Sequence, residues 1–293
     1  GGPAGLLSAI MLAQKFPERK IQVYDRLGEP PSPTDDGVWS DVAKFYLIGL
    51  GSRGQGALSK FGVWPDVEAV STAVVGRKDW APDSDEGVER IFTDRPVTTQ
   101  VLPRDKLVGV LSQHIKNKYG KQIELNYGYE VQPMDFAAGS NGNAVLVQVA
   151  RCDESTRINP ASVSKTSGSE PDRLCTTDDF QMLSTDLLIA ADGTARTIAN
   201  EIERADKQHR SEIKNLFARV VKGLRPFRVK RYLDDNQRIY KTIPMKIPSE
   251  WRHDLNYSAR TKGGRVTFDA LPANEKGEYC GVLLLKKEDP LAQ

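Results

Sequence analysis

The residues best suited to bind a ligand lie at the start of the chain, where two glycines precede an apolar run. Gly2 and Gly5 have the spacing of the last two glycines of a G-x-G-x-x-G pattern, whose first glycine would lie upstream of residue 1. Such glycines let the backbone approach a pyrophosphate and let a helix pack closely on a sheet. The first turn of that helix offers unpaired N–H groups and a partial positive charge to phosphates. A plain glycine turn before a buried helix is the alternative.

An acid follows the glycines at a meaningful distance. Asp25 ends the short strand-like run Ile21–Tyr24, about twenty residues after Gly5, where a carboxylate would accept hydrogen bonds from ribose hydroxyls. A carboxylate there favours an unphosphorylated ribose, and therefore FAD or NAD over NADP. Glycines, helix, strand and acid in this order are typical of a dinucleotide-binding βαβ unit.

Two further signals lie deeper in the chain. The pair Asp192-Gly193 follows the apolar run Leu187–Ala191, which predicts a carboxylate at the C-terminal edge of a sheet, where α/β proteins bind ligands. A simple β-to-α turn is the alternative reading of this pair. Arg104 lies in the first turn of a predicted helix, where the helix dipole disfavours a cation. An anionic or polar partner would explain its position.

Helices and strands must position these residues. Apolar residues recur at helical spacing after Gly5 and again from Leu107 to Ile115, which predicts two half-buried helices. His114 falls on the buried face of the second helix, which indicates a structural rather than a catalytic histidine. A buried strand is predicted over residues 183–191 and a helix over 196–204. The polar stretch 152–179 is expected to be a long hairpin tip or an insertion.

The end of the chain has a different character. Strands are predicted over residues 237–245, 255–261, 265–271 and 278–285, joined by Gly or Asn turns, which indicates an antiparallel region. A basic stretch from residue 205 to 231 precedes it. We therefore expect a second domain from about residue 205.

Composition excludes several functions. Hydrophobic residues make up 39% and charged residues 27% of the 293 residues, as in globular proteins, and the net charge of +2 gives no general attraction to nucleic acid. No apolar run reaches the length of a membrane helix. The three cysteines have no ligand-pair spacing and are expected to be free thiols in a reducing compartment. We find no metal cluster and no constellation for hydrolysis.

Three motifs occur in one order: the glycines with Asp25, then Leu102–Leu107, then Ala190–Gly193. In this order and spacing, the chain resembles the class A flavoprotein monooxygenases, a family of aromatic hydroxylases. Residues 47–63 look most like the kynurenine hydroxylases of that family. The family's later Gly-Asp segment would lie beyond Gln293, so the chain looks truncated at both ends.

The resemblance implies an α/β fold with a Rossmann-like, three-layer FAD- and NAD(P)-binding domain at residues 1–204. The start of an antiparallel β-sheet substrate domain would follow at 205–293, with residues 66–100 contributing to the substrate face. Gly2 and Gly5 would serve the FAD pyrophosphate, and Asp25, with Arg26 beside it, the adenosine ribose. Arg104, Asp192 and Gly193 would also contact FAD. Arg77 would hold a substrate carboxylate, a task that suits a bidentate guanidinium.

The same resemblance implies a reaction. NAD(P)H would reduce FAD, O2 would add as a flavin C4a-hydroperoxide, and oxygen would pass to a small aromatic substrate without a protein acid or base. The chain departs from the family after Asp192-Gly193, where Arg196 and Ala199 replace a serine and an arginine. An aromatic hydroxyl expected near Phe92 is also lacking. A flavoprotein-derived interaction subunit with a protein partner, or a flavin enzyme for dehydrogenation or epoxidation, are the alternatives.

Overall fold

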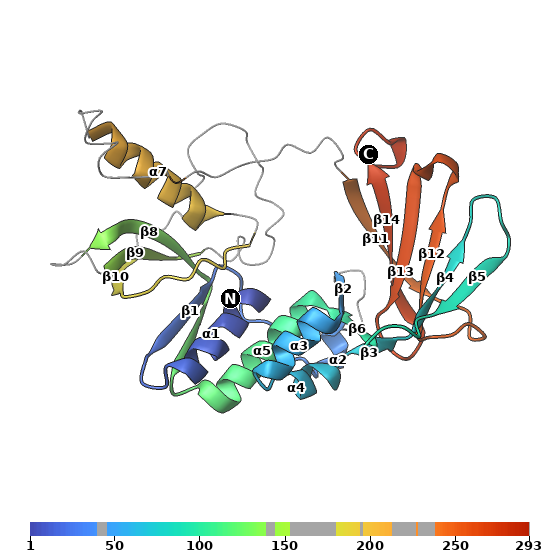
Figure 1. Ribbon diagram of the computed structural model, residues 1–293, viewed down its shortest axis with the longest axis horizontal. Helices are drawn as coiled ribbons and strands as arrows, with labels where there is room; N and C mark the ends of the chain where they lie inside the picture. Colours follow the sequence, from blue (N-terminus) through green and yellow to red (C-terminus); the bar gives the residue numbers. More distant parts are fainter. Residues whose placement is uncertain are drawn as a thin grey trace. The chain divides into compact units, whose positions relative to one another are not determined.

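The computed structural model describes residues 1–39, 46–138, 144–152, 180–193, 196–212, 227 and 238–292. The chain forms two compact units (Figure 1). The first unit comprises Gly1–Glu29 and Tyr119–Tyr232, and the second comprises Pro30–Lys118 and Leu233–Gln293. Each unit is built from two separate stretches of chain. The functional boundary expected near residue 205 is a different division and stays a prediction.

The first unit begins with the predicted helix and strand. Helix α1 (Pro3–Lys15) has Gly2 as its N-cap and a proline in its first turn, where the missing N–H costs no hydrogen bond. Its buried side chains recur at helical spacing and are Leu6, Ala9, Ile10 and Ala13. Strand β1 (Ile21–Asp25) pairs in parallel with β7 (Ile123–Tyr127). The helix and the strand predicted from the sequence are both confirmed.

A second sheet in this unit is antiparallel and has the order β10-β9-β8. Its strands are β8 (Tyr129–Ala138), β9 (Ala144–Arg151) and β10 (Phe180–Thr185). The polar stretch 152–179 connects β9 to β10, and all of it except Cys152 lies outside the described residues, including Cys175. Cys152 is disulfide-bonded, so the prediction of free thiols is wrong at this position. Cys280 is not in a disulfide, as predicted, and it is buried.

The buried strand predicted over residues 183–191 is only partly present. Strand β10 ends at Thr185, and residues 187–192 have no strand hydrogen bonding to any described strand. Leu187 is 62% exposed and Ile189 is 41% exposed, so this apolar run is not buried. Apolar composition alone does not make a strand, because a strand also needs a neighbour that accepts its backbone hydrogen bonds. Helix α7 (Thr197–Glu212) follows and is longer than the predicted helix.

In its described part, the second unit contains four α-helices, two 3₁₀ turns and a small antiparallel sheet of order β2-β6-β3. Its strands are β2 (Leu47–Leu50), β3 (Thr72–Val74) and β6 (Thr99–Pro103), and its helices are α2 (Asp36–Trp39), α3 (Ser52–Lys60), α4 (Trp64–Glu68) and α5 (Arg104–Tyr119). The two 3₁₀ turns are η2 (Lys262–Gly264) and η3 (Pro290–Ala292). On α5, His114 is 4% exposed, and its Nδ1 lies 2.6 Å from Oδ2 of Asp66. This contact suits the structural role expected for the histidine.

A six-stranded sheet, here called the platform sheet, forms the rest of the second unit (Figure 1). Its strand order is β11-β14-β13-β12-β4-β5. The strands are β4 (Gly76–Trp80), β5 (Gly87–Ile91), β11 (Arg238–Lys246), β12 (Leu255–Arg260), β13 (Val266–Pro272) and β14 (Glu278–Lys286). Only the β12–β4 pair is parallel. The hairpin β4–β5 thus joins the four C-terminal strands that were predicted from the sequence.

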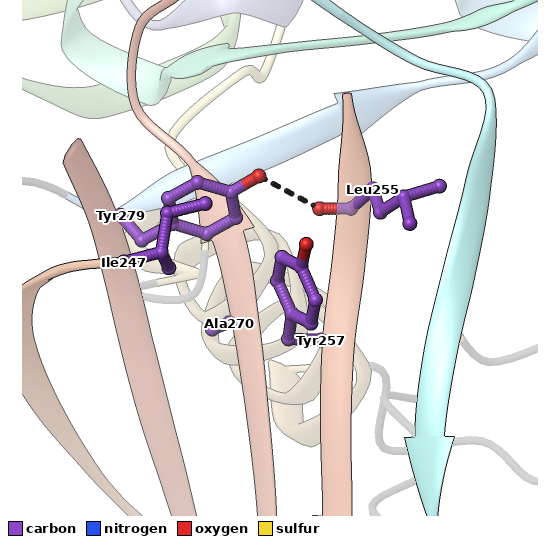
Figure 2. Close-up of a cluster of buried hydrophobic side chains, with 5 residues drawn as sticks. All are labelled: Ile247, Leu255, Tyr257, Ala270 and Tyr279. Atoms are coloured by element: carbon purple, nitrogen blue, oxygen red, sulfur yellow. Dashed lines mark hydrogen bonds between the residues drawn. The ribbon is translucent and has the colours of Figure 1, made fainter. Parts of the chain in front are cut away.

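One face of the platform sheet carries an aromatic core (Figure 2). The buried members of this core are Ile247, Leu255, Tyr257, Ala270 and Tyr279, with Trp80, Trp251 and Phe268 packed against them. Tyr279 is fully buried, and its hydroxyl donates a hydrogen bond of 3.0 Å to the carbonyl oxygen of Leu255. Burial raises the pKa of the Tyr279 phenol and so keeps it neutral. The core therefore satisfies the polar end of its largest side chain.

Among the described residues, none of the helices combines the length and the apolar character that crossing a membrane requires.

Candidate functional site

The amino end of α1 has the geometry of an anion site. Gly2, its N-cap, provides no side-chain cap, and the first turn contains no acidic residue, so no side chain of the helix itself offsets the N–H groups and the positive end of the dipole there. At Gly1, an added Cβ would lie 2.3 Å from Cβ of Asp25, which no side chain tolerates. The backbone nitrogen of Gly1 donates a hydrogen bond of 3.0 Å to the carbonyl of Tyr24. Sequence reasoning missed Gly1, although it directly precedes Gly2.

Asp25 lies at the end of β1, next to this helix end. Its side chain is 20% exposed, and its Oδ1 accepts a hydrogen bond of 2.9 Å from the backbone N–H of Leu27. The hydrogen bond to Leu27 therefore orients the turn that follows the strand. The rest of the carboxylate lies near Gly1. Arg26 is half-buried in that same turn. The structure thus brings together Gly1, Gly2 and Asp25, which the sequence separates by a helix.

The Asp-Gly motif, Ala190–Gly193, meets the glycine motif at Gly5. A Cβ added to Gly5 would lie 3.3 Å from Cβ of Ala191, so the helix approaches this segment more closely than most side chains would permit. Ala191 directly precedes Asp192 and Gly193. The close approach therefore places the Asp-Gly pair beside α1, even though residues 187–192 do not form the predicted strand. This contact joins two motifs that lie far apart in the sequence.

Asp192 also has a local structural task. Its Oδ2 accepts a hydrogen bond of 3.1 Å from the backbone N–H of Ile198, in the first turn of α7. A carboxylate at this place satisfies one of the unpaired N–H groups and complements the helix dipole. Gly193 has a φ of +64°, a left-handed conformation that favours glycine. Both residues of the pair therefore shape the turn that leads into α7.

Arg104 and Arg77 belong to the second unit. Arg104 begins α5, is 41% exposed, and its Nη1 donates a hydrogen bond of 2.7 Å to Oδ1 of Asp105. Arg77 lies on β4, where its Nε donates a hydrogen bond of 2.8 Å to Oδ1 of Asp79 and its Nη2 donates to the same oxygen. Sequence reasoning did not anticipate Asp79, although alternate residues of a strand share a face.

A second glycine-rich loop lies between β2 and α3. Residues 49–54 have the G-x-G-x-x-G pattern and line a cavity of about 320 Å³. Gln55, which is 7% exposed, holds the loop because its Nε2 donates hydrogen bonds to the carbonyls of Leu50 and Thr98. Arg53 is one of the residues that line this cavity.

No family model matches the sequence, and no curated protein matches it. Solved structures do match its fold. One is PieE, a flavin-dependent monooxygenase whose structure holds FAD and substrate, with 15% identity and a TM-score of 0.62 over 100% of this chain and 42% of PieE. Another is the p-nitrophenol 4-monooxygenase PnpA of Pseudomonas putida DLL-E4, with 15% identity and a TM-score of 0.60 over 99% of this chain and 56% of PnpA.

A flavoprotein/dehydrogenase of Cytophaga hutchinsonii also matches, with 15% identity and a TM-score of 0.58 over 99% of this chain and 54% of that protein. The chain spans about half of the length of these structures. It therefore has an α/β fold with mixed and antiparallel sheets of the kind found in flavin-dependent monooxygenases. Because every identity is low, the likeness defines the fold and leaves the activity to be argued from the site.

Proposed function

We propose that the protein is an FAD-dependent oxidoreductase that hydroxylates a small aromatic substrate with NAD(P)H and O2. The observation that carries this proposal is the approach of Gly5 to Ala191, because it joins the glycine motif to the Asp-Gly pair on this particular fold. If Gly2 and Gly5 formed only a turn before a buried helix, nothing would require the Asp-Gly pair to lie beside that helix. The monooxygenases PieE and PnpA share this fold, which supports monooxygenation as the reaction class.

The residues around α1 fit the adenosine diphosphate part of FAD. Gly2 and Gly5 would admit the pyrophosphate to the amino end of the helix, and Asp25 and Arg26 would contact the ribose. Asp192 and Gly193 would contact the cofactor from their turn, and Arg104 would contribute a positive charge. Bound FAD would supply electron transfer from the nicotinamide and activation of O2. The protein's own task would be to orient the ring and exclude water.

We further propose that residues 1–204 act as the FAD-binding domain and that residues 205–293, together with 66–100, act as the substrate domain. The union of β4 and β5 with the C-terminal strands supports this contribution of 66–100. The finer likeness to kynurenine 3-monooxygenase rests on residues 47–63 and on Arg77. Asp79 already pairs with Arg77, so a substrate carboxylate would have to share this guanidinium with it.

A visible absorption spectrum of the purified protein tests the proposal. A yellow protein with the bands of oxidised flavin, and NADPH oxidation that speeds up when an aromatic acid is added, would support it. A colourless protein would instead favour an interaction subunit derived from a flavoprotein. The use of Asp192 to cap α7 favours this second candidate, since it gives the carboxylate a task that needs no cofactor.

Replacing Arg104 with alanine separates cofactor binding from folding. We expect flavin content to fall several-fold, because a charge-assisted hydrogen bond is lost. The free energy of unfolding should stay the same or rise by about 0.3–1 kcal/mol, because a cation at a helix amino end opposes the dipole. Flavin per protein and urea unfolding measure the two effects.

Lys118→Ala is the matched control, since it removes a cation from the other end of the same helix. Flavin content should not change in this control. Equal flavin content in Arg104→Ala and the parent protein would show that Arg104 does not contact the cofactor.

A further inference from the structure

The face of the platform sheet opposite the aromatic core carries a row of polar side chains. On β4 and β12, Arg77 is the register partner of Asn256, and Asp79 is the partner of Ser258. On β13, Asp269 is the partner of Ser258. Because register partners and alternate residues share a face, these five side chains form one group, here called the polar row.

Two members of the polar row have buried atoms without a partner. Ser258 is 4% exposed, and neither its Oγ nor Oδ1 of Asn256 has a hydrogen-bond partner among the described residues. An unpaired buried polar atom costs free energy, so such atoms in a folded protein call for an explanation. Both lie on adjacent positions of one strand face, two residues apart. A ligand that binds at this point would satisfy both atoms.

The polar row can be approached from outside the sheet. The side chains of Arg77 and Asp79, which flank the two buried atoms, are 35% and 26% exposed, and Asp269 is half-buried. The other face cannot play this part, because Tyr257 and Tyr279 fill it with the aromatic core. Leu271 and Cys280 cover one end of the row's face by packing against the small sheet at Leu47, Val74 and Val101. These packed apolar side chains, here called the apolar boundary, therefore lie beside the polar row.

The charges of the polar row favour a neutral ligand group. Asp79 occupies Nε and Nη2 of Arg77, which form one of the two edges with which a guanidinium can bind a carboxylate through two hydrogen bonds. Asp269 adds a negative charge beside Ser258. The unpaired Oδ1 of Asn256 only accepts hydrogen bonds, whereas the Ser258 hydroxyl both donates and accepts. A carboxylate would leave Asn256 unsatisfied, whereas a hydroxyl group could donate to Asn256 and accept from Ser258.

We propose that the polar row is a subsite for a neutral hydroxyl group on the aromatic substrate, with Asn256 and Ser258 as its hydrogen-bond partners. The aromatic part of this inference rests on the proposed function. The subsite would orient the ring by its hydroxyl, and it would reject rings that lack a hydrogen-bond donor. The apolar boundary at Leu271 would adjoin the ring itself.

Calorimetric titration of the protein with phenol, anisole and benzoate tests the subsite without relying on turnover. Phenol donates and accepts, whereas anisole and benzoate only accept. The parent protein should bind phenol more tightly than either. Ser258→Ala should weaken phenol binding roughly fivefold, the usual worth of one neutral hydrogen bond, and leave benzoate binding unchanged. Thr242→Ala is the matched control, because Thr242 is exposed on β11 and should bind phenol like the parent.

Thermal unfolding gives a second readout that a merely structural serine would not produce. Without phenol, Ser258→Ala should raise Tm by about 2–4 °C, because the substitution removes an unsatisfied buried hydroxyl. Saturating phenol should raise Tm of the parent more than Tm of the variant. Equal phenol affinity of parent and Ser258→Ala, or no phenol binding by the parent up to its solubility limit, would overturn the proposal.

Flavin content, recorded for the same samples, keeps the two proposals apart. A colourless parent protein that still binds phenol through Ser258 would contradict the flavin assignment and support the subsite. A yellow parent protein whose phenol affinity is unchanged by Ser258→Ala would support the flavin assignment and contradict the subsite.

Discussion

Gly5→Val is expected to yield a protein without flavin whose free energy of unfolding is lower by about 2 kcal/mol. A Cβ at Gly5 would already lie 3.3 Å from Cβ of Ala191, so the two extra methyl groups of valine must push α1 away from the segment that carries Asp192. Well-packed regions resist such insertion, because neighbouring side chains leave their preferred rotamers. Displacement of α1 would also move its N–H groups away from the cofactor phosphates.

The matched control is Ala4→Val, one residue earlier on the same helix. Ala4 is exposed, so valine there should lower the free energy of unfolding only through the lower helix propensity of a β-branched residue, by about half a kcal/mol. Visible absorbance per protein reports flavin content, and urea unfolding reports stability. If Gly5→Val resembles Ala4→Val in both measurements, then α1 does not depend on close contact with residues 191–193, and the cofactor site loses its main support.

Tyr279→Ala is expected to cost about 3–5 kcal/mol of unfolding free energy, as large aromatic deletions in cores do. Tyr279 is fully buried in the aromatic core of the platform sheet and binds the carbonyl of Leu255 at 3.0 Å (Figure 2). The substitution leaves a cavity beside Tyr257 and removes the hydroxyl donor from a buried carbonyl. Tyr279→Phe keeps the ring, so it should cost only about 0.5–1.5 kcal/mol.

Tyr240→Ala serves as the comparison, because Tyr240 is 66% exposed on edge strand β11 of the same sheet. This change should stay within about 0.5 kcal/mol of the parent. Urea unfolding followed by tryptophan fluorescence suits the experiment, since Trp80 and Trp251 pack against the core. A loss in Tyr279→Ala no larger than that in Tyr240→Ala would mean that this core does not hold the sheet together.

Local patterns predicted much of the secondary structure. The helical spacing after Gly5 and from Leu107 to Ile115 matched α1 and α5, and the four C-terminal strands matched β11 to β14 within two residues. These patterns succeed because one face of each element is buried, and burial imposes the period of the helix or strand on the sequence. The run Leu187–Ala191 failed, because its strand would have required a hydrogen-bonding neighbour that no local pattern reveals.

The candidate site was predicted less completely than the elements that hold it. The sequence pointed to Gly2, Gly5, Asp25, Asp192 and Gly193, but their mutual proximity depends on the contact of Gly5 with Ala191. It pointed to Arg77 but not to Asp79, although the hydrogen bond between these two side chains decides which ligands the guanidinium can bind. The unpaired atoms of Asn256 and Ser258 carried no sequence signal at all, because serine and asparagine are common in polar loops and edge strands.

By itself, the sequence determined where α1, α5 and the four C-terminal strands form and which residue types stand at their ends, because those properties depend on neighbours a few positions away. Only the tertiary structure decided that β12 lies parallel to β4 and that Ala191 lies against Gly5. It alone showed that Asp192 caps α7. These pairings join residues far apart in the chain, and they form because burial and backbone hydrogen bonding are satisfied by the whole fold rather than by any local segment.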